Sequence, residues 1–263
     1  MTTAAYSRAG SSAGYAPIAV LVAALLQILT PVLPALGVGE PIGSQSDSVR
    51  TLITPAGWAF SIWGALYTGS LLFAIYQLLP AQRNNALLER TRWPAAGAFL
   101  GNALWAAYTQ VFGLTALSVV IIAVTLCCLI VIYRSFTTPR FTSGERWLVY
   151  LPLSALAAWL TVATTVNIAA SLRYHGVEAG DAAPAVGLAV LVVAGVIAAI
   201  ALVRGRGNIP YAGVFLWALA AIYAAGGQVA SLIALGTGIA AILVLAGLFM
   251  GLRAERRVSP FRD

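Results

Sequence analysis

Eight long apolar runs follow one another through the chain, and they constrain its fold more than any other feature. A helix needs about 20 apolar residues to cross the hydrocarbon core of a bilayer. The runs cover approximately residues 16–38, 55–79, 93–112, 115–133, 147–171, 184–203, 211–231 and 236–252. They do not alternate polar and apolar residues, as the strands of a membrane β-barrel do. We therefore expect an all-α integral membrane protein with eight transmembrane helices.

The composition agrees with this fold class. Of the 263 residues, 60% are hydrophobic and only 9% are charged, whereas a soluble domain carries about 25% charged residues. The first apolar run, from Ala16 to Leu36, is longer than the roughly 7–15 apolar residues of a secretory signal. We therefore expect this run to be a retained transmembrane helix.

The basic residues are distributed unevenly between the connections. The chain has no lysine and 15 arginines, and thirteen arginines lie in the N-terminal tail and in every second connection after it. Only Arg50 and Arg173 lie on the opposite side. Because cytoplasmic segments of membrane proteins carry the excess of positive charge, we expect both termini to be cytoplasmic, in a bacterial cytoplasmic (inner) membrane. The formal charge of +7 then reflects membrane topology, and no nucleic-acid partner is expected.

Two helix boundaries depend on short glycine-containing segments. The third and fourth helices meet in a tight turn at residues 112–115. The turn between the seventh and eighth helices has two candidates, Gly226-Gly227-Gln228 and Gly236-Thr237-Gly238. We favour the second candidate, because it leaves both helices nearly long enough to span the bilayer.

The predicted spans lack the residues that most membrane chemistry requires. Every carboxylate and the single histidine, His175, lie in connections or tails, and no arginine lies in the middle of a span. Ion-coupled transporters usually need charge inside the membrane, and a metal site needs clustered His, Cys or carboxylate ligands. The adjacent Cys127 and Cys128 are poorly placed to form a disulfide with each other. We therefore predict no metal site and no catalytic residues, which favours a binding or transport protein over an enzyme.

Neutral polar and aromatic residues instead share faces of three helices. In the second helix Phe60, Trp63 and Tyr67 recur at helical spacing. Asn102 and Trp105 share a face of the third helix. Trp159, Ala163 and Asn167 form a stripe on the fifth helix.

These faces allow two interpretations. Small and polar residues in membrane helices often hold helices together, and Asn102 and Asn167 fit that role. Alternatively, the faces line a flat aromatic cavity with a few hydrogen-bonding groups, which suits a planar apolar ligand. Trp93 and Trp147 stand at helix starts beside arginines and are expected to be interfacial anchors.

The order and spacing of these residues resemble the translocator-protein family (TspO/MBR, tryptophan-rich sensory proteins). The second helix reads Pro55-x-x-Trp58-x-Phe60-x-x-Trp63-x-x-x-Tyr67, which is similar to the family's second-helix signature. Asn102-x-x-Trp105 and Trp159-x-x-x-Ala163-Thr164-x-x-Asn167 resemble its third-helix and fifth-helix patterns. The resemblance covers about residues 16–174.

The resemblance implies a five-helix bundle with an internal pocket, covered here by the loop at about Gly39–Thr54. It predicts a division into a cytoplasmic tail (1–15), the TspO-like bundle (16–174), a three-helix extension (175–252) and a basic cytoplasmic tail (253–263). The pocket residues that it implies are Trp58, Phe60, Trp63, Tyr67, Asn102, Trp105, Trp159, Ala163 and Asn167.

Family members are associated with porphyrins, sterols and synthetic pocket ligands. The resemblance therefore implies a membrane protein that binds a planar apolar ligand, porphyrin-like or sterol-like, and senses or transports it. A tetrapyrrole is expected as a ligand and not as a cofactor, and no cofactor is required. The alternatives are a passive carrier or exporter of a small hydrophobic solute and a porphyrin-modifying enzyme. The ligand's identity, the oligomeric state (a homo-oligomer is compatible with the pattern) and the role of the last three helices stay open.

Overall fold

The computed structural model describes residues 9–136 and 141–258, and every regular element in these ranges is helical. The α-helices are α1 (Ala9–Leu29), α2 (Ile42–Ser48), α3 (Ile62–Tyr76), α4 (Ala86–Phe112), α5 (Ala116–Ser135), α6 (Ser143–Glu145), α7 (Leu151–Tyr174), α8 (Ala183–Arg204), α9 (Ile209–Ile222) and α10 (Ser231–Val258). Short 3-10 segments cover Thr30–Leu36, Gly57–Ser61, Pro80–Gln82 and Gly180–Ala182, and π turns cover Arg146–Tyr150 and Tyr223–Gly227. Residues 1–8 and 259–263 of the two expected tails lie outside the described residues.

Seven helical segments in the described ranges are long and apolar enough to cross a membrane, and the chain is an integral membrane protein. These segments contain α1, α3, α5, α7, α8, α9 and α10. The expected third span, α4, is 27 residues long but is not among them. Its first turns carry Glu89, Arg90 and Arg92, and its buried face carries Asn102 and Gln110, which lower its hydropathy.

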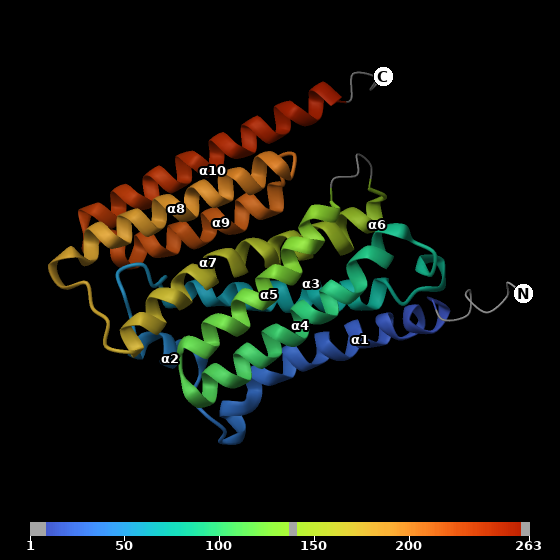
Figure 1. The fold of residues 1–263 in the computed structure, drawn as a ribbon, viewed down its shortest axis with the longest axis horizontal. Coiled ribbons are helices and arrows are strands. Elements are labelled where there is room, and N and C mark those ends of the chain that lie inside the picture. The colour runs from blue at the N-terminus through green and yellow to red at the C-terminus, as the bar shows by residue number, and fades with distance from the viewer. Residues whose placement is uncertain (1–8, 137–140, 259–263) are drawn as a thin grey trace, which may run out of the picture.

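Helix α7 occupies the centre of the arrangement. It contacts α3, α5 and α9, and every residue from 152 to 162 is buried. Helix α4 packs against both α1 and α5, and α1 also contacts α3. Figure 1 shows α9 beside α7, with α8 and α10 on the side away from α1. The five-helix part and the three C-terminal helices therefore meet mainly where α7 and α9 pack together.

Helix α4 extends from one end of the five-helix part to the other. At its start the Nδ2 atom of Asn85 donates a hydrogen bond to Oε1 of Glu145 (2.9 Å), in the short helix α6. At its end Gly113 adopts a left-handed conformation (φ 79°) and packs against the ring of Tyr174, the last residue of α7. Thr115 then caps α5 by accepting a hydrogen bond from the amide of Leu117 (3.3 Å). The tight turn predicted at residues 112–115 is confirmed.

The preferred turn at Gly236-Thr237-Gly238 is wrong, because these residues lie inside α10. The chain turns instead after the π turn Tyr223–Gly227, which contains the first candidate's glycines. Thr237 donates its hydroxyl hydrogen to the carbonyls of Ile233 and Ala234, as a helical threonine does. Gly236 lies against Leu188 in α8, so this glycine serves close helix packing rather than a turn.

Glycines on both helices bring α8 and α10 close together. A Cβ atom at Gly195 in α8 would lie 2.7 Å from the Cα atom of Ala240. A Cβ atom at Gly247 in α10 would lie 2.6 Å from the Cα atom of Ala199. Small residues allow membrane helices to approach closely and gain van der Waals contact. The interface between α8 and α10 therefore depends on the absence of side chains at these positions.

We predict that Gly195→Ala lowers the free energy of unfolding by about 1–3 kcal/mol, because the new methyl group would overlap the backbone of α10. Alanine is otherwise the better helix former, so propensity alone predicts the opposite sign. Gly213→Ala in α9 is the matched control, because no atom lies within 4 Å of the position of its added Cβ. Thermal unfolding of the purified protein in detergent measures both variants. Equal stability of the two variants would contradict this account.

Candidate functional site

An aromatic cluster forms where α3 packs against α7. The ring of Trp63 stacks on Tyr67 (5.1 Å between centroids) and meets Trp159 edge-on (6.0 Å, 84°). Phe60 contacts the other side of the cluster through Trp159 (6.3 Å). The helices approach closely because Gly69 of α3 faces Pro152 of α7, where a Cβ atom would lie 2.7 Å from the proline Cβ. The cluster brings together Phe60, Trp63, Tyr67 and Trp159, four of the nine predicted pocket residues.

Two buried indole nitrogens in this cluster have no acceptor. The Nε1 atoms of Trp63 and Trp159 are buried and make no hydrogen bond within the described part of the chain. A buried donor without a partner costs about 1–3 kcal/mol. Buried tryptophans normally find a partner for the N–H group. Two such donors on rings that touch each other therefore mark an unusual site.

A second pair of polar groups continues from the cluster. Asn102 of α4 donates from Nδ2 to Oε1 of Gln27 in α1 (3.2 Å). The Asn102 Oδ1 and Gln27 Nε2 atoms are buried and have no hydrogen-bond partner among the described residues. Tyr67 interacts with the Asn102 side chain and so connects this pair to Trp63. The unpaired atoms thus follow one series of contacting side chains from α7 through α3 and α4 to α1.

Two further predicted pocket residues, Trp105 and Asn167, make hydrogen bonds between helices. The indole of Trp105 donates to Oδ1 of Asn167 (2.7 Å), and Nδ2 of Asn167 donates to the hydroxyl of Ser118 (2.8 Å). These bonds join α4, α7 and α5, and all three side chains are buried. Asn167 therefore has the helix-connecting role that its residue type also predicted.

Trp58 and Ala163 lie at the edges of the predicted site. Trp58 is 48% exposed, and its ring meets Trp217 of α9 edge-on (4.8 Å, 84°). Trp217 also donates from Nε1 to the carbonyl of Ala59 (3.3 Å). Trp58 therefore contributes to the contact with the C-terminal helices. Ala163 is half-buried, one turn after Trp159 on α7.

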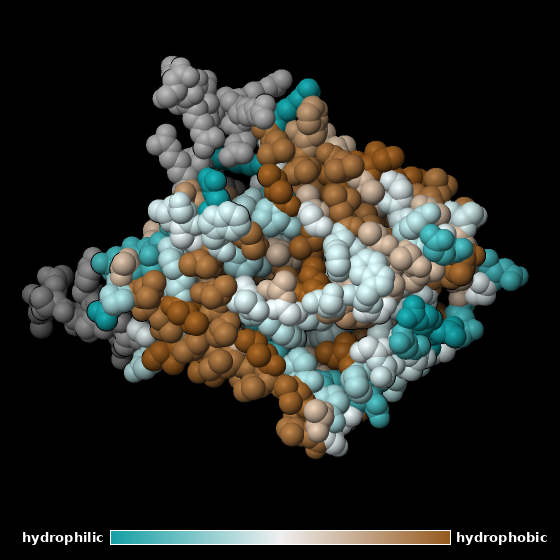
Figure 2. Space-filling model, turned by 180° about the vertical axis from the view of Figure 1, so that it is seen from behind, coloured by the Kyte–Doolittle hydropathy of each residue, from teal (hydrophilic) through white to brown (hydrophobic). Residues whose placement is uncertain are grey.

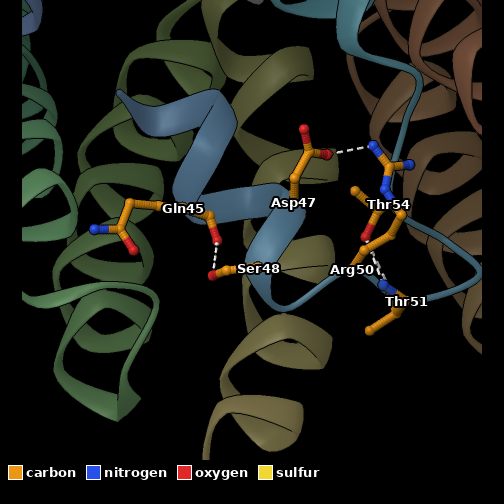
Figure 3. Close-up of polar contacts among 6 residues, drawn as sticks. All are labelled: Gln45, Asp47, Ser48, Arg50, Thr51 and Thr54. Carbon is orange, nitrogen blue, oxygen red and sulfur yellow. Dashed lines mark hydrogen bonds and ion pairs between the residues drawn. The ribbon is translucent and has the colours of Figure 1, made fainter. Parts of the chain in front are cut away.

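The loop expected to cover the pocket closes one end of the five-helix part. It contains α2 and is fixed to the end of α4, because the amide of Glu40 and Nε2 of Gln45 donate to the carbonyl of Gln110 (2.8 and 3.3 Å). Figure 3 shows Gln45 and Ser48 on α2 and shows Arg50, Thr51 and Thr54 on the stretch of chain that follows this helix. Beyond this stretch the amide of Ala56 donates to the carbonyl of Ala221 in α9 (3.0 Å).

Sequence reasoning missed several residues that shape the site. Gln27 is a polar residue within the first span, but a single helix does not reveal its partner Asn102 on α4. Trp217 gave no signal beyond being aromatic. Asn208 donates from Nδ2 to Ser154 (2.8 Å), and the Tyr211 hydroxyl donates to Thr161 (3.1 Å), which fixes α9 against α7. A polar residue at the start of an apolar helix was the only available sign of that contact.

In the described residues no three His, Cys, Asp or Glu side chains gather as a metal site would require. Cys127 and Cys128 form no disulfide. The aromatic cluster itself offers ring faces for stacking, apolar surface and two indole N–H donors.

The sequence model of the TSPO-like protein family matches residues 15–250. The chain belongs to the TSPO-like protein family. No curated protein and no solved structure matches it. The TSPO-like match extends past residue 174, where the resemblance of individual motifs ended, and includes α8, α9 and most of α10. The division of this TSPO-like chain into a bundle and an extension stays a prediction.

We predict that Asn167→Leu lowers the free energy of unfolding by about 1–2 kcal/mol, because it removes the acceptor of Trp105 and the donor to Ser118. Asn102→Leu is the comparison, because one polar atom of Asn102 is already unpaired and this substitution removes fewer bonds. Unfolding of both variants in detergent, followed by circular dichroism, gives the two values. A larger loss for Asn102→Leu would refute the assignment of Asn167 as the main helix-connecting residue.

Proposed function

We propose that this TSPO-like protein is a membrane receptor that binds a planar apolar ligand, porphyrin-like or sterol-like, at the cluster of Phe60, Trp63, Tyr67 and Trp159. The observation that carries this proposal is the pair of buried, unpaired indole N–H groups on contacting rings. A ligand that supplies acceptors would relieve their cost. Membership of the family supports the ligand class.

The arrangement suits a flat ligand with polar groups at its edge. The rings of Trp63 and Trp159 stand at 84° to each other, so a planar molecule that stacks on one ring presents its edge to the other. The two indoles would donate to carboxylate, carbonyl or hydroxyl oxygens. The Asn102 Oδ1 atom would accept a hydrogen bond from the ligand, as a pyrrole N–H or a hydroxyl can give.

The cover of α7 by other helices becomes incomplete next to the cluster. The helix is fully buried from 152 to 162, but the next four residues, 163–166, are each only half-buried. Four successive residues point to all sides of a helix, so α7 is incompletely covered all around at this level. A small-molecule site needs such space next to its polar groups.

The covering loop favours a receptor over a carrier. Hydrogen bonds hold the loop to Gln110 at the end of α4, and Ala56, two residues after the loop, is held to Ala221 in α9. A carrier needs two accessible states, and opening this end of the protein would break both attachments. Counterflow of a candidate solute in liposomes would identify a carrier directly.

We further propose that α4 is the eighth span and that both termini are cytoplasmic. The connection before α4 contacts α6, whereas the turn after α4 contacts the end of α7, so α4 crosses the whole bundle. Figure 1 also shows α1 beginning and α10 ending on the same side as α6. We predict that a cysteine at Ser48 reacts with an impermeant maleimide in spheroplasts and that one at Ser143, which is also exposed, does not, both in a Cys127→Ala, Cys128→Ala background. The reverse pattern would overturn this orientation.

For the receptor, we predict that protoporphyrin IX binds the purified protein saturably and that Trp63→Phe with Trp159→Phe weakens binding at least about tenfold. These substitutions keep aromatic rings but remove both unpaired donors, and each hydrogen bond to a charged acceptor contributes about 1.5–3 kcal/mol. The change in the porphyrin absorbance spectrum measures binding independently of tryptophan fluorescence.

Trp93→Phe is the matched control, because Trp93 is 52% exposed near the start of α4. Binding that survives the double substitution, or a signal that never saturates, would show that porphyrin only partitions into the detergent micelle. Loss of porphyrin absorbance under illumination that requires Trp63 and Trp159 would instead favour the enzyme alternative.

A further inference from the structure

A separate cleft lies at the seam between the five-helix part and the C-terminal helices. Its volume is about 730 Å³, within the roughly 300–1,000 Å³ of small-molecule sites. Residues 50–53 of the covering loop, the last turns of α7, the α7–α8 connection, the first turns of α8 and the π turn after α9 enclose it. None of the predicted pocket residues lines it.

Most of the cleft wall is apolar. Ile53, Leu172, Val186, Val190 and Val229 are among its lining side chains. At Gly226 the loop backbone comes so near that any Cβ atom would overlap the carbonyl of Leu52. This contact positions the loop as one wall of the cleft. Such a surface suits an alkyl or isoprenoid chain.

Positive groups also line the same cleft. Arg50 and Arg173 line it, and they are the two arginines that the charge pattern separates from the other thirteen. The N-terminus of α8, a helix of 22 residues, also borders the cleft through Ala183. Helix N-termini and guanidinium groups both favour anions.

Nearby carboxylates accept hydrogen bonds from only some of the N–H donors of these two arginines. Arg173 donates to Glu178 through Nη1 alone (2.7 Å), and Arg50 donates to Asp47 through Nη2 alone, as Figure 3 shows. The side chains of both arginines are more than 40% exposed (45% and 42%). Exposed ion pairs of this kind are weak and exchange readily. The remaining guanidinium donors are available to a further anion.

We propose that this cleft binds an amphiphile with one anionic head, a carboxylate or a phosphate, and an apolar chain. The anionic head lies between Arg50 and Arg173 at the N-terminus of α8, and the apolar chain of the ligand lies along Val186, Val190 and Leu172. The site is independent of the aromatic cluster. The protein would then bind a lipid-like ligand in addition to the proposed planar one.

Photolabelling of the intact protein in phosphatidylcholine nanodiscs tests this assignment. The probe is palmitate that carries a diazirine on its chain, and peptide mass spectrometry locates the label. We expect labelling of residues 169–190 and 225–229, competed by oleate but not by oleyl alcohol, which has the same chain without the charge. Phosphatidic acid in the disc is the second competitor. Stronger competition by phosphatidic acid assigns a phosphate head, and stronger competition by oleate assigns a carboxylate.

Substitutions distinguish labelling within the cleft from labelling at the general lipid-facing surface. Val186→Trp fills the cleft and should abolish the labelling, whereas Val193→Trp, an exposed position of α8 outside the cleft, should leave it unchanged. Arg173→Gln should weaken competition by oleate about tenfold. Glu178→Gln should strengthen it, because it frees the Nη1 donor of Arg173. A purely structural role for this ion pair predicts no gain.

Equal competition by oleyl alcohol, or labelling that persists in Val186→Trp, would overturn the proposal. The same variants are also titrated with protoporphyrin IX, and the two results are compared. Val186→Trp should retain porphyrin binding, and the Trp63→Phe, Trp159→Phe variant should retain palmitate labelling. Failure at one site is thereby distinguished from failure at the other.

Discussion

The burial of α7 fixes the position of the helices that contact it. This helix has neighbours on several sides, so it cannot present a single apolar face to a core and polar residues to solvent. Its polar side chains instead form hydrogen bonds with different helices along its length. Ser154 and Thr161 bond to residues at the start of α9, and Asn167 bonds to α4 and α5. In lipid, packing and such hydrogen bonds replace the hydrophobic effect as the force between helices.

The candidate ligand site differs from these connecting contacts in one respect. Asn167 accepts the hydrogen bond of Trp105, whereas one buried polar atom on each of four side chains has no partner within 9–136 and 141–258: Trp63, Trp159, Asn102 and Gln27. Networks that are fully satisfied make a fold more specific, and partly satisfied ones are costly. Costs of this kind often persist where a protein must bind something. The same α-helical bundle thus contains a satisfied network that connects helices and an unsatisfied one that we propose for ligand recognition, about two turns apart on α7.

Helical periodicity predicted which residues share a face but not which helix that face meets. Phe60, Trp63, Tyr67 and Trp159 do come together, because α3 and the 3-10 segment before it present the first three to α7, which carries Trp159. Trp58 belongs to the same motif but meets Trp217, a partner 159 positions away that no local pattern reveals. Glycines are ambiguous in the same way: Gly113 makes a turn, whereas Gly236 permits close packing, and the sequence around each looks alike. The cleft could not be predicted, because its walls come from three segments that are far apart in the sequence, 50–53, 169–190 and 225–229.

The close contact of α8 with α10 also bears on how the protein is made. Synthesis proceeds from the N-terminus, so α8 enters the membrane before its main partner exists. Its glycine-containing face, with Gly187 and Gly195, must remain in contact with lipid or with transient partners while α9 and α10 are added. Only then can α10 fold back along α8, with α9 already fixed to α7 by Asn208 and Tyr211. Among the helices described, α10 is therefore the one that completes the packing around α8.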